Sequence, residues 1–577
     1  MSIIDEIKKL KKPNAPWNKF YSREQRNLSV PEKTMYELLE ESFICYEHNV
    51  AIEYFGNKIT YAEFEKLILK TERALRSQGI RKGDVVTICS PNIPEALYCF
   101  YALNKIGAIP EMIHPLSSEV EIINYLKSTS SVMLITVDMC YEKVKNVLKE
   151  TNVYKTILLS IKDSMPFFSG FIYRISAGRG IEKPERKAEY LTWRQLLASS
   201  RNYPEDYPSK TDLHAPAVIL HSGGTTGVPK SILLSNYGFN VQAMQARIMM
   251  PNLVPGDTVL GILPIFHGFG LGVTLHCSFC KGLKVVLIPK FDSRTFDKLL
   301  IKHKPSLVTG VPTLYEALTG TNNKKIDLSC LKYALTGGDS MSLTLIDKVN
   351  DFFHNHGANI NIAQGYGMTE AMSAVTATFD PVANKKGSIG IPLPESYIKI
   401  VTPGTQSEVP IGTDGEICIS GPTVMLGYLD NEKETNEVLQ KHKDGRIWLH
   451  SGDMGMMDSD GVLFYKQRIK RMLITSGYNV YPSQIEQVIC SHEGVLNCTV
   501  IGIPHKYKVQ VAKAFVVLKE GYRESNVKKE IQELCKKHLA VYSQPYEYEF
   551  RKSLPKTVVG KIDFKELERE SLEKKNG

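Results

Sequence analysis

One glycine-rich segment of this chain reads Ser222-Gly223-Gly224-Thr225-Thr226-Gly227-Val228-Pro229-Lys230-Ser231. Its glycines allow a tight turn that exposes successive backbone N–H groups, and its hydroxyls and its lysine add further donors. The apolar run at 217–220 predicts a buried strand that ends at this loop. Such a loop suits a polyphosphate, and a plain glycine-rich turn is an equal alternative from this segment alone. It is not of the Walker type, because two residues separate Gly227 from Lys230.

Length and composition are those of an ordinary globular protein. The 577 residues suffice for three or four domain-sized units, 23% of them are charged, and the formal net charge is +9. Basic and acidic residues are interleaved through most of the chain. The charge therefore suits an anionic small substrate or a lipid surface, and it does not indicate a face that binds nucleic acid.

The cysteines and the first residues bear on the compartment. Most of the eleven cysteines stand singly in apolar runs, which indicates buried thiols in a reducing environment. Cys277 and Cys280 follow His276 at a metal-like spacing, but without a second pair nearby, packing of an apolar helix is the favoured interpretation. Residues 1–12 are charged and no run reaches the ~18 apolar residues that span a bilayer, so we expect a cytoplasmic protein.

From residue 51 onward, strand and helix patterns alternate. Thr60 and Glu63 have the spacing of a capping box, which predicts a helix start there. A buried strand is expected at 85–89, a helix at 93–106 and another strand at 132–136. This alternation predicts an α/β fold with largely parallel sheets. Residues 1–50, with three prolines, are expected to form an extended lead-in.

An apolar aromatic patch at 165–173 interrupts the alternation and is followed by Arg174 and Arg179. Such a patch, if exposed, can rest on an anionic membrane or deliver an apolar substrate. A surface insertion that packs on its own domain is the favoured alternative. The segment 165–179 therefore stands as a candidate for peripheral membrane contact.

Three further strand patterns end in polar, glycine-rich loops, at 264–270, 336–340 and 364–370. Ligands bind at the carboxyl ends of strands in open α/β sheets, so these loops and the phosphate loop are expected to build one site. Beyond Gly415 the pattern changes to short alternating strands, which predicts a β-rich subdomain. The last hundred or so residues predict a small α+β unit, with strands at 496–501 and 512–518 and helices at 483–489 and 526–538.

With these motifs in view, the chain resembles the adenylate-forming superfamily of acyl-CoA synthetases, aryl-CoA ligases, luciferases and adenylation domains. The resemblance runs from about residue 59 to the end and rests on five motifs in the family's order. They are the phosphate loop at 222–230, Gly365-Tyr366-Gly367-Met368-Thr369-Glu370, Ser451-Gly452-Asp453, Arg468, and Pro555-Lys556-Thr557-Val558-Val559-Gly560-Lys561. It implies a large N-terminal AMP-binding domain, residues 1–469, and a mobile C-terminal lid domain, residues 470–577.

The implied cofactors are ATP, Mg²⁺ and coenzyme A. The resemblance gives Lys561, Glu370 and His267 catalytic roles: Lys561 would bridge the attacking carboxylate and the α-phosphate, and His267 would flank the carboxylate pocket. Glu370 with Thr226 would hold Mg²⁺. The residues implied to bind nucleotide or CoA are Ser222, Gly223, Gly224, Thr225, Thr226, Gly227, Lys230, Gly338, Asp339, Tyr366, Gly367, Thr369, Asp453, Arg468, Lys470, Gly477 and Tyr478.

Within that set, each group has a physical task. Tyr366 offers a ring face to adenine, Asp453 can accept both ribose hydroxyls, and Arg468 has a fork of donors for the ribose and phosphate side. Lys470 is the hinge by position, about which the family's lid rotates between two half-reactions. The hinge rotation would bring 475–478 into the pantetheine channel.

The sequence narrows the substrate without fixing it. Segment 265–270 lacks the aspartate with which amino-acid-activating relatives bind an ammonium group, and its glycines leave room for a long apolar acid. We therefore expect a medium- or long-chain fatty acid as substrate and CoA as acceptor. The alternatives are an aryl or other acid, an acyl-AMP ligase that loads an acyl carrier protein, and a non-catalytic nucleotide-binding regulator. Ser231, Gln467 and Ile474 depart from the family's common pattern, and Ile474 bears on the thioester step.

Overall fold

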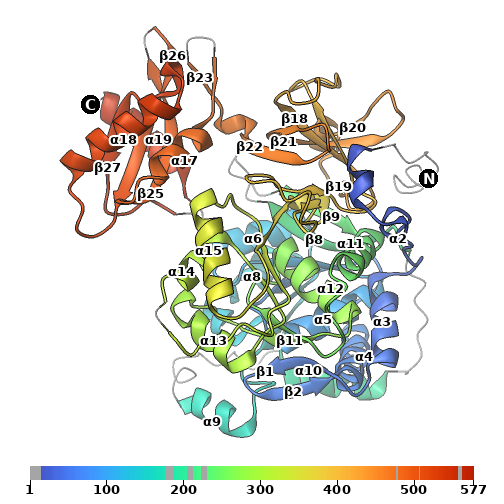
Figure 1. Ribbon diagram of the computed structural model, residues 1–577. Coiled ribbons are helices and arrows are strands. Elements are labelled where there is room, and N and C mark those ends of the chain that lie inside the picture. The colour runs from blue at the N-terminus through green and yellow to red at the C-terminus, as the bar shows by residue number, and fades with distance from the viewer. Residues whose placement is uncertain are drawn as a thin grey trace. The chain divides into compact units, whose positions relative to one another are not determined.

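The computed structural model describes residues 15–175, 188–203, 212–222, 230–321, 323–475, 478–505, 507–556 and 562–576. The chain forms two compact units (Figure 1). The first contains Met1–Ile398 and Ile419–Leu449, and the second contains Lys399–Cys418 and His450–Gly577. No helix among the described residues is long and apolar enough to cross a membrane.

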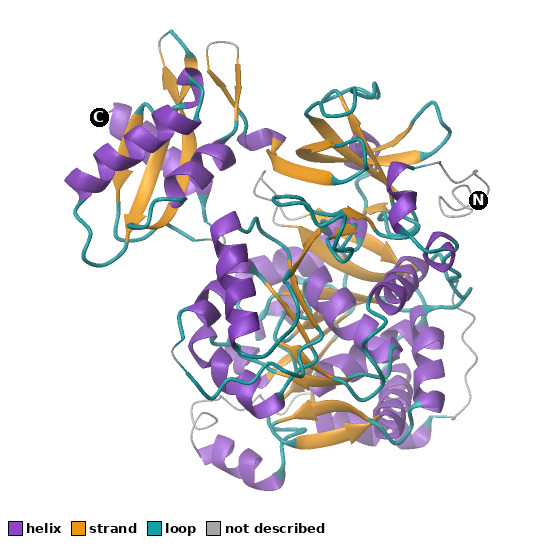
Figure 2. Cartoon of the chain, in the orientation of Figure 1, coloured by secondary structure: helices purple, strands orange, loops and turns teal. Residues whose placement is uncertain are grey.

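Two sheets, covered by helices, form the first unit (Figure 2). The nine-stranded sheet has the order β16-β15-β14-β13-β12-β10-β11-β1-β2, and all its central pairs are parallel. Its strands are β1 (Val50–Tyr54), β2 (Asn57–Thr60), β10 (Thr258–Gly261), β11 (Lys284–Leu287), β12 (Leu307–Gly310), β13 (Tyr333–Thr336), β14 (Ala363–Tyr366), β15 (Thr376–Ala377) and β16 (Ile391–Pro392).

The eight-stranded sheet has the order β19-β9-β8-β4-β3-β5-β6-β7, parallel from β8 to β7. It contains β3 (Val85–Cys89), β4 (Ile109–Ile113), β5 (Met133–Val137), β6 (Lys155–Leu159), β7 (Tyr190–Thr192), β8 (Pro216–Ser222), β9 (Lys230–Ser235) and β19 (Gly427–Tyr428). The prediction of α/β units with largely parallel sheets is confirmed.

The described helices of the first unit cover these sheets (Figure 2). They are α2 (Arg23–Arg26), α3 (Met35–Cys45), α4 (Tyr61–Ser77), α5 (Pro94–Ile106), α6 (Glu119–Ser128), α7 (Tyr141–Val144), α8 (Val147–Glu150), α9 (Phe167–Ile175), α10 (Trp193–Ser199), α11 (Asn236–Met249), α12 (Cys277–Cys280), α13 (Phe296–His303), α14 (Pro312–Thr319), α15 (Leu343–Asn355) and α16 (Glu432–Val438). The predicted capping box is present, because the Thr60 side chain accepts from the Glu63 N–H and the Glu63 carboxylate accepts from the Thr60 N–H.

Another sheet and a small α+β unit account for the remaining strands. The former has the order β17-β18-β21-β20 with β22 beside β21, and comprises β17 (Tyr397–Val401), β18 (Gly415–Ser420), β20 (Leu439–Lys441), β21 (Ile447–Met457) and β22 (Leu463–Arg468). The boundary between the two units crosses β17, β18 and β21. The predicted β-rich subdomain is therefore present.

The C-terminal sheet has the order β24-β23-β26-β25 with β27 beside β26. Its strands are β23 (Leu473–Thr475), β24 (Tyr478–Val480), β25 (Val495–His505), β26 (Val509–Leu518) and β27 (Glu547–Phe550), and its helices are α17 (Pro482–Cys490), α18 (Glu524–His538) and α19 (Phe564–Asn576). Each element predicted there is found within a few residues of its expected range. The predicted domain boundary at 469/470 stays a prediction.

Two sequence expectations were wrong in detail. Residues 1–50 are not only an extended lead-in, because α3 is an eleven-residue helix with a capping box between Thr34 and Glu37. The prolines all precede this cap, and Leu38, Leu39 and Phe43 lie at helical spacing and are buried. The second concerns Gly365 and Tyr366, which belong to β14 and not to the loop after it, since both pair with β15.

Glu95, in the first turn of α5, is a fully buried carboxyl group. The Ser164 hydroxyl donates to its Oε1, and its Oε2 has no hydrogen-bond partner among the described residues. Burial raises the Glu95 pKa from 4.5 to about 8. Since the folded protein holds this proton and the unfolded chain releases it, the contribution of Glu95 to stability is greatest below pH 4.5 and is lost as the pH rises to about 8.

We expect Glu95→Gln to remove this loss, because the amide stays neutral at every pH. The free energy of unfolding of the variant at pH 8 should exceed that of the wild type by on the order of 3 kcal/mol, and the difference should shrink toward pH 5. Urea unfolding from pH 5 to pH 9 measures it, with Glu316→Gln on the exposed face of α14 as the control. A constant difference across this range would contradict the assignment.

Candidate active site

The two ends of the predicted phosphate loop are fixed by a hairpin. β8 and β9 pair antiparallel, and Ser222, the last residue of β8, lies opposite Lys230, the first residue of β9. The strand predicted before the loop is therefore present. Gly223, Gly224, Thr225, Thr226 and Gly227 lie outside the described residues.

Lys230 contacts two residues that the sequence did not single out. Its Nζ lies 2.5 Å from Oε2 of Glu434 on α16 and 4.6 Å from the ring centre of Tyr428 on β19. The two side chains are 27% and 34% exposed, while the Oε2 atom of Glu434 that faces Lys230 is itself buried. An anion at the loop would compete with Glu434 for this ammonium group.

Tyr428 also connects the phosphate hairpin to Glu370. It pairs with Ile232 of β9, and its hydroxyl donates to Oε1 of Glu370 at 3.2 Å. Glu370, in a short helical turn η7 (Thr369–Ala371), is buried, and its carbonyl accepts from the Met425 N–H. Its Oε2 has no partner among the described residues. A buried carboxylate with one oxygen left without a partner among the described residues is a fitting ligand for a hard cation such as Mg²⁺.

The other loops follow strands of the nine-stranded sheet. Because β10, β13 and β14 are parallel, their carboxyl ends share one edge. This edge carries Gly338 and Asp339, both exposed after β13, and Tyr366, Gly367 and Thr369 at the end of β14. A Cβ on Gly367 would lie 1.4 Å from the Ser373 carbonyl oxygen, so only glycine fits there. The expected convergence thus holds within this sheet, whereas the phosphate loop belongs to the other sheet.

His267 lies before a π-helix, η5 (Phe269–His276), that follows β10. It is exposed, and the Phe269 N–H donates to its Nδ1 at 3.3 Å. In the neutral ring this bond places the proton on Nε2. The π-helix was not predicted; it depends on glycines, because a Cβ on Gly270 would lie 2.0 Å from the Pro264 carbonyl oxygen.

His276, Cys277 and Cys280, which have a metal-like spacing in the sequence, are packed in the core, as the favoured interpretation predicts. All three residues are buried, and the His276 Nδ1 lies 3.3 Å from the Tyr101 hydroxyl. Burial lowers the His276 pKa to about 3, so the ring is neutral.

In the second unit, Asp453 and Arg468 lie opposite each other on β21 and β22. The Arg468 Nε is 3.0 Å from Oδ1 of Asp453, which is buried, while half of the arginine side chain is exposed. Ser451 supports this arrangement, since its hydroxyl donates to the Ile417 carbonyl and accepts from the Asp453 N–H. The pair presents a carboxylate and a guanidinium together, as a ribose phosphate requires.

The remaining predicted residues of this unit are only partly described. Lys470 is exposed in the turn η8 (Ile469–Arg471), directly after Arg468. Tyr478 begins β24, and its side chain lies outside the described part, as do Gly477 and Lys561. Ile474 is 45% exposed on β23.

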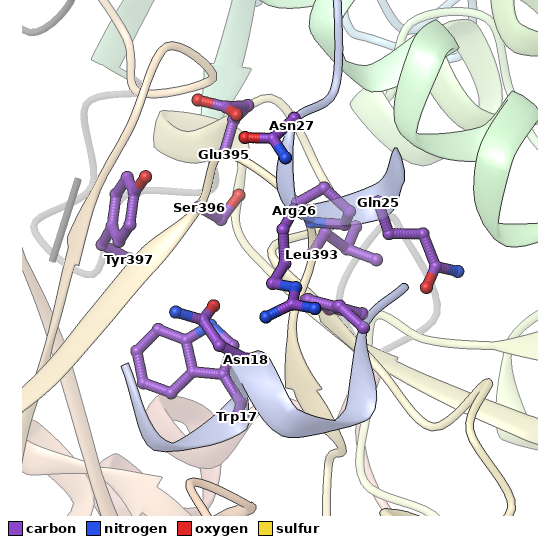
Figure 3. A pocket seen from close by; sticks show the side chains of 11 residues that line it. Trp17, Asn18, Gln25, Arg26, Asn27, Leu393, Glu395, Ser396 and Tyr397 are labelled. Atoms are coloured by element: carbon purple, nitrogen blue, oxygen red, sulfur yellow. The ribbon is translucent and has the colours of Figure 1, made fainter. Parts of the chain in front are cut away.

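A cavity of about 280 Å³ lies elsewhere in the first unit, between residues 17–27 and 393–397 (Figure 3). Trp17, Arg26 and Tyr397 are among its lining side chains. It contains none of the predicted site residues, so it has no part in the site built above.

Comparison with known proteins identifies the family of this chain. Residues 39–429 match the family model described as AMP-binding enzyme, and residues 484–561 match the AMP-binding enzyme C-terminal domain. A long-chain-fatty-acid–CoA ligase of Bacillus subtilis (strain 168) is 32% identical over 97% of this chain and 98% of its own. A probable 4-coumarate–CoA ligase 1 of Dictyostelium discoideum is 31% identical over 95% and 97%. ATP-bound MatB of Rhodopseudomonas palustris shares the fold, with a TM-score of 0.78 at 22% identity over 93% and 99%.

The chain therefore belongs to the AMP-binding enzyme family. The predicted enzyme class, an AMP-forming acid–CoA ligase, is confirmed, and so is the fold. The roles of the individual site residues remain proposals.

Proposed function

We propose that this enzyme activates a medium- or long-chain fatty acid as acyl-AMP and transfers the acyl group to CoA. The observation that carries the proposal is the full-length similarity to a long-chain-fatty-acid–CoA ligase. The segment 264–270 supports it, since it offers His267 and no carboxylate beside the predicted acid pocket. Full-length similarity to a probable 4-coumarate–CoA ligase keeps an aromatic acid as the second candidate.

The proposed chemistry has two half-reactions. First, a carboxylate oxygen of the acid attacks the α-phosphorus of ATP, a new O–P bond forms, and pyrophosphate leaves with the electrons of the broken P–O bond. Then the CoA sulfur attacks the acyl carbon, the C–O bond to AMP breaks, and the thiol proton is lost. Phosphoryl transfer depends mainly on positioning and on charge stabilisation, which fits a site of lysines, an arginine and glycine-rich backbone.

Each described group has a task in this proposal. Lys230 offers its ammonium to the β- and γ-phosphates after release from Glu434, and Tyr366 lies at the strand end where adenine would stack. Asp453 accepts the ribose hydroxyls and Arg468 donates beside it. Glu370 would hold Mg²⁺, which supplies charge neutralisation at the phosphates.

The test is release of pyrophosphate from Mg-ATP with a panel of carboxylic acids, followed by thioester formation. Saturated acids of six to eighteen carbons, 4-coumarate and an amino acid form the panel, and free CoA is compared with an acyl carrier protein as acceptor. We expect acids of eight or more carbons to give the highest kcat/KM, with CoA as acceptor. Preference for 4-coumarate or for the carrier protein would replace the proposal with that alternative.

The same proposal includes peripheral contact with an anionic membrane through the segment 165–179. On α9, Phe167, Phe168, Phe171 and Ile172 are 85%, 80%, 55% and 64% exposed, so the alternative of an insertion packed on its own domain does not hold for them. The helix lies at the border of the unit (Figure 1). The residues just before the helix, 161–164, are held by two hydrogen bonds: the Tyr54 hydroxyl donates to the Ile161 carbonyl, and the Asn57 side chain donates to the Ser164 carbonyl.

Charge favours a lipid surface as the occupant of this patch. Residues 174–187 contain five basic and two acidic side chains. Aromatic side chains at the level of the headgroups, together with basic residues, are the pattern of an interfacial helix. A fatty acid partitions into the same surface, so this contact would place the enzyme at its substrate.

We expect the double substitution Phe167→Ser/Phe168→Ser to weaken binding to vesicles of phosphatidylglycerol and phosphatidylcholine at least tenfold, because the two rings lose their burial in lipid. Vesicle co-sedimentation measures this, and Val382→Ser, at another exposed apolar residue, is the control. Equal binding of the double variant, or binding to neutral vesicles alone, would contradict the contact.

A further inference from the structure

A buried carboxylate contacts the hairpin of β8 and β9 that carries the predicted phosphate loop, and it has no role in the nucleotide site proposed above. Glu111, on β4, is completely buried. The hydroxyls of Thr87 and Thr129 donate to its Oε2, and the Nε2 of His221 lies 2.9 Å from its Oε1. Among the ion pairs of the described residues, His221 is its partner, and no lysine or arginine joins it.

His221 is the residue directly before Ser222. Its side chain is only 8% exposed, and the ring of Tyr125 on α6 lies against it with a centroid distance of 4.3 Å. β4 and β8 are parallel neighbours with Glu111 opposite Ile219, so His221, two residues further, has its side chain on the same face as the Ile219 side chain. The imidazole is thus held from β4 on one side and from α6 on the other.

This contact bears on both ends of the loop. Ser222 follows His221 directly, and in the hairpin His221 lies opposite Ser231 while Ser222 lies opposite Lys230. A buried polar group is costly unless it is hydrogen-bonded, so displacement of the imidazole would leave the Oε1 of Glu111 without a partner among the described residues. The cost of that displacement opposes any shift of β8 at this point.

We propose that His221, held by Glu111, is a positioning residue for ATP: it fixes the strand ends from which Ser222 and Lys230 reach the phosphates. The inference rests on the proposed assignment of the 222–230 loop to the phosphates of ATP. The ring does not touch the nucleotide; it acts through the backbone of β8. Loss of the pair therefore leaves Ser222 and Lys230 less firmly positioned, and the affinity for ATP falls while the acid and CoA sites remain intact.

The double substitution Glu111→Leu/His221→Leu tests this without leaving a lone buried charge. Thr87 and Thr129 keep partners in the variant, namely the Ser131 hydroxyl and the Tyr125 carbonyl. We expect KM for ATP to rise about tenfold, with kcat and the KM values for acid and CoA within about twofold. Glu72→Leu/Arg76→Leu, which removes the buried pair of α4, is the matched control and should leave KM for ATP unchanged.

A purely structural pair would lower the unfolding temperature of both double variants and leave KM for ATP unchanged in the folded fraction; that result would overturn the inference. His221→Gln, whose amide can still donate to Glu111, should keep KM for ATP within about threefold, while His221→Leu should not. These single variants carry the test if the double variant does not fold. Thr226→Ala separates the two proposals, because an unchanged KM for ATP in that variant would reject the loop assignment itself.

Discussion

Replacing Lys561 with alanine should lower the rate of acyl-AMP formation by at least about 10³-fold. In the proposed first half-reaction the ammonium group lies between two anions, the attacking carboxylate and the α-phosphate. Without it, the two reactants repel each other and lose their alignment. Thioester formation from supplied acyl-AMP needs no such bridge and should stay within a fewfold of the wild type.

The two steps are measured separately, by acid-dependent exchange of pyrophosphate into ATP and by CoA-dependent consumption of synthetic acyl-AMP. Lys556→Ala is the matched control, because Lys556 belongs to the same motif and its backbone bridges to Ile562 across the loop. It should retain most of both activities. An equal loss of acyl-AMP formation and of thioester formation in Lys561→Ala would contradict the assignment of this lysine to adenylation. It would also contradict the expectation that the lid domain takes a different orientation in each half-reaction.

The elements that the sequence predicted well are those whose signal is local. The strand at 85–89 is a short, mostly apolar run, and Thr60 with Glu63 is a complete capping box. Both depend on neighbouring residues alone. The helix α3 is not predicted, because the three prolines that precede it favour an extended chain, whereas the helical spacing of its own apolar residues indicates a helix.

The site residues that the sequence missed are those that act through distant contacts. No local motif marks Tyr428 in the sequence. The pairing of β19 with β9 brings its ring to Lys230, and its hydroxyl donates to Glu370, which lies 58 residues earlier in the chain. Glu434 is one of several acidic residues on α16, and only its distance to Lys230 distinguishes it. His221 could have been noticed beside the loop, but its partner Glu111 lies 110 residues away.

Replacement of Glu370 should have the second largest effect on the rate of acyl-AMP formation. We expect Glu370→Gln to lower acyl-AMP formation by about 10²-fold and to raise the Mg²⁺ concentration needed for half-maximal rate. The amide keeps an oxygen that can accept from Tyr428 but loses the negative charge. Glu370 is buried and its second oxygen has no partner among the described residues, so we expect its charge to be available to a cation.

Tyr428→Phe distinguishes charge from placement. This variant keeps the carboxylate and removes the hydroxyl that donates to Oε1, so the expected loss of rate is about three- to tenfold, with a smaller shift in Mg²⁺ dependence. Glu432→Gln, at an exposed acid of α16, should change neither quantity. A Mg²⁺ titration of the adenylation rate for the three variants decides the matter: if Glu370→Gln has the wild-type Mg²⁺ requirement, the metal is held elsewhere, and the free oxygen of Glu370 has another role.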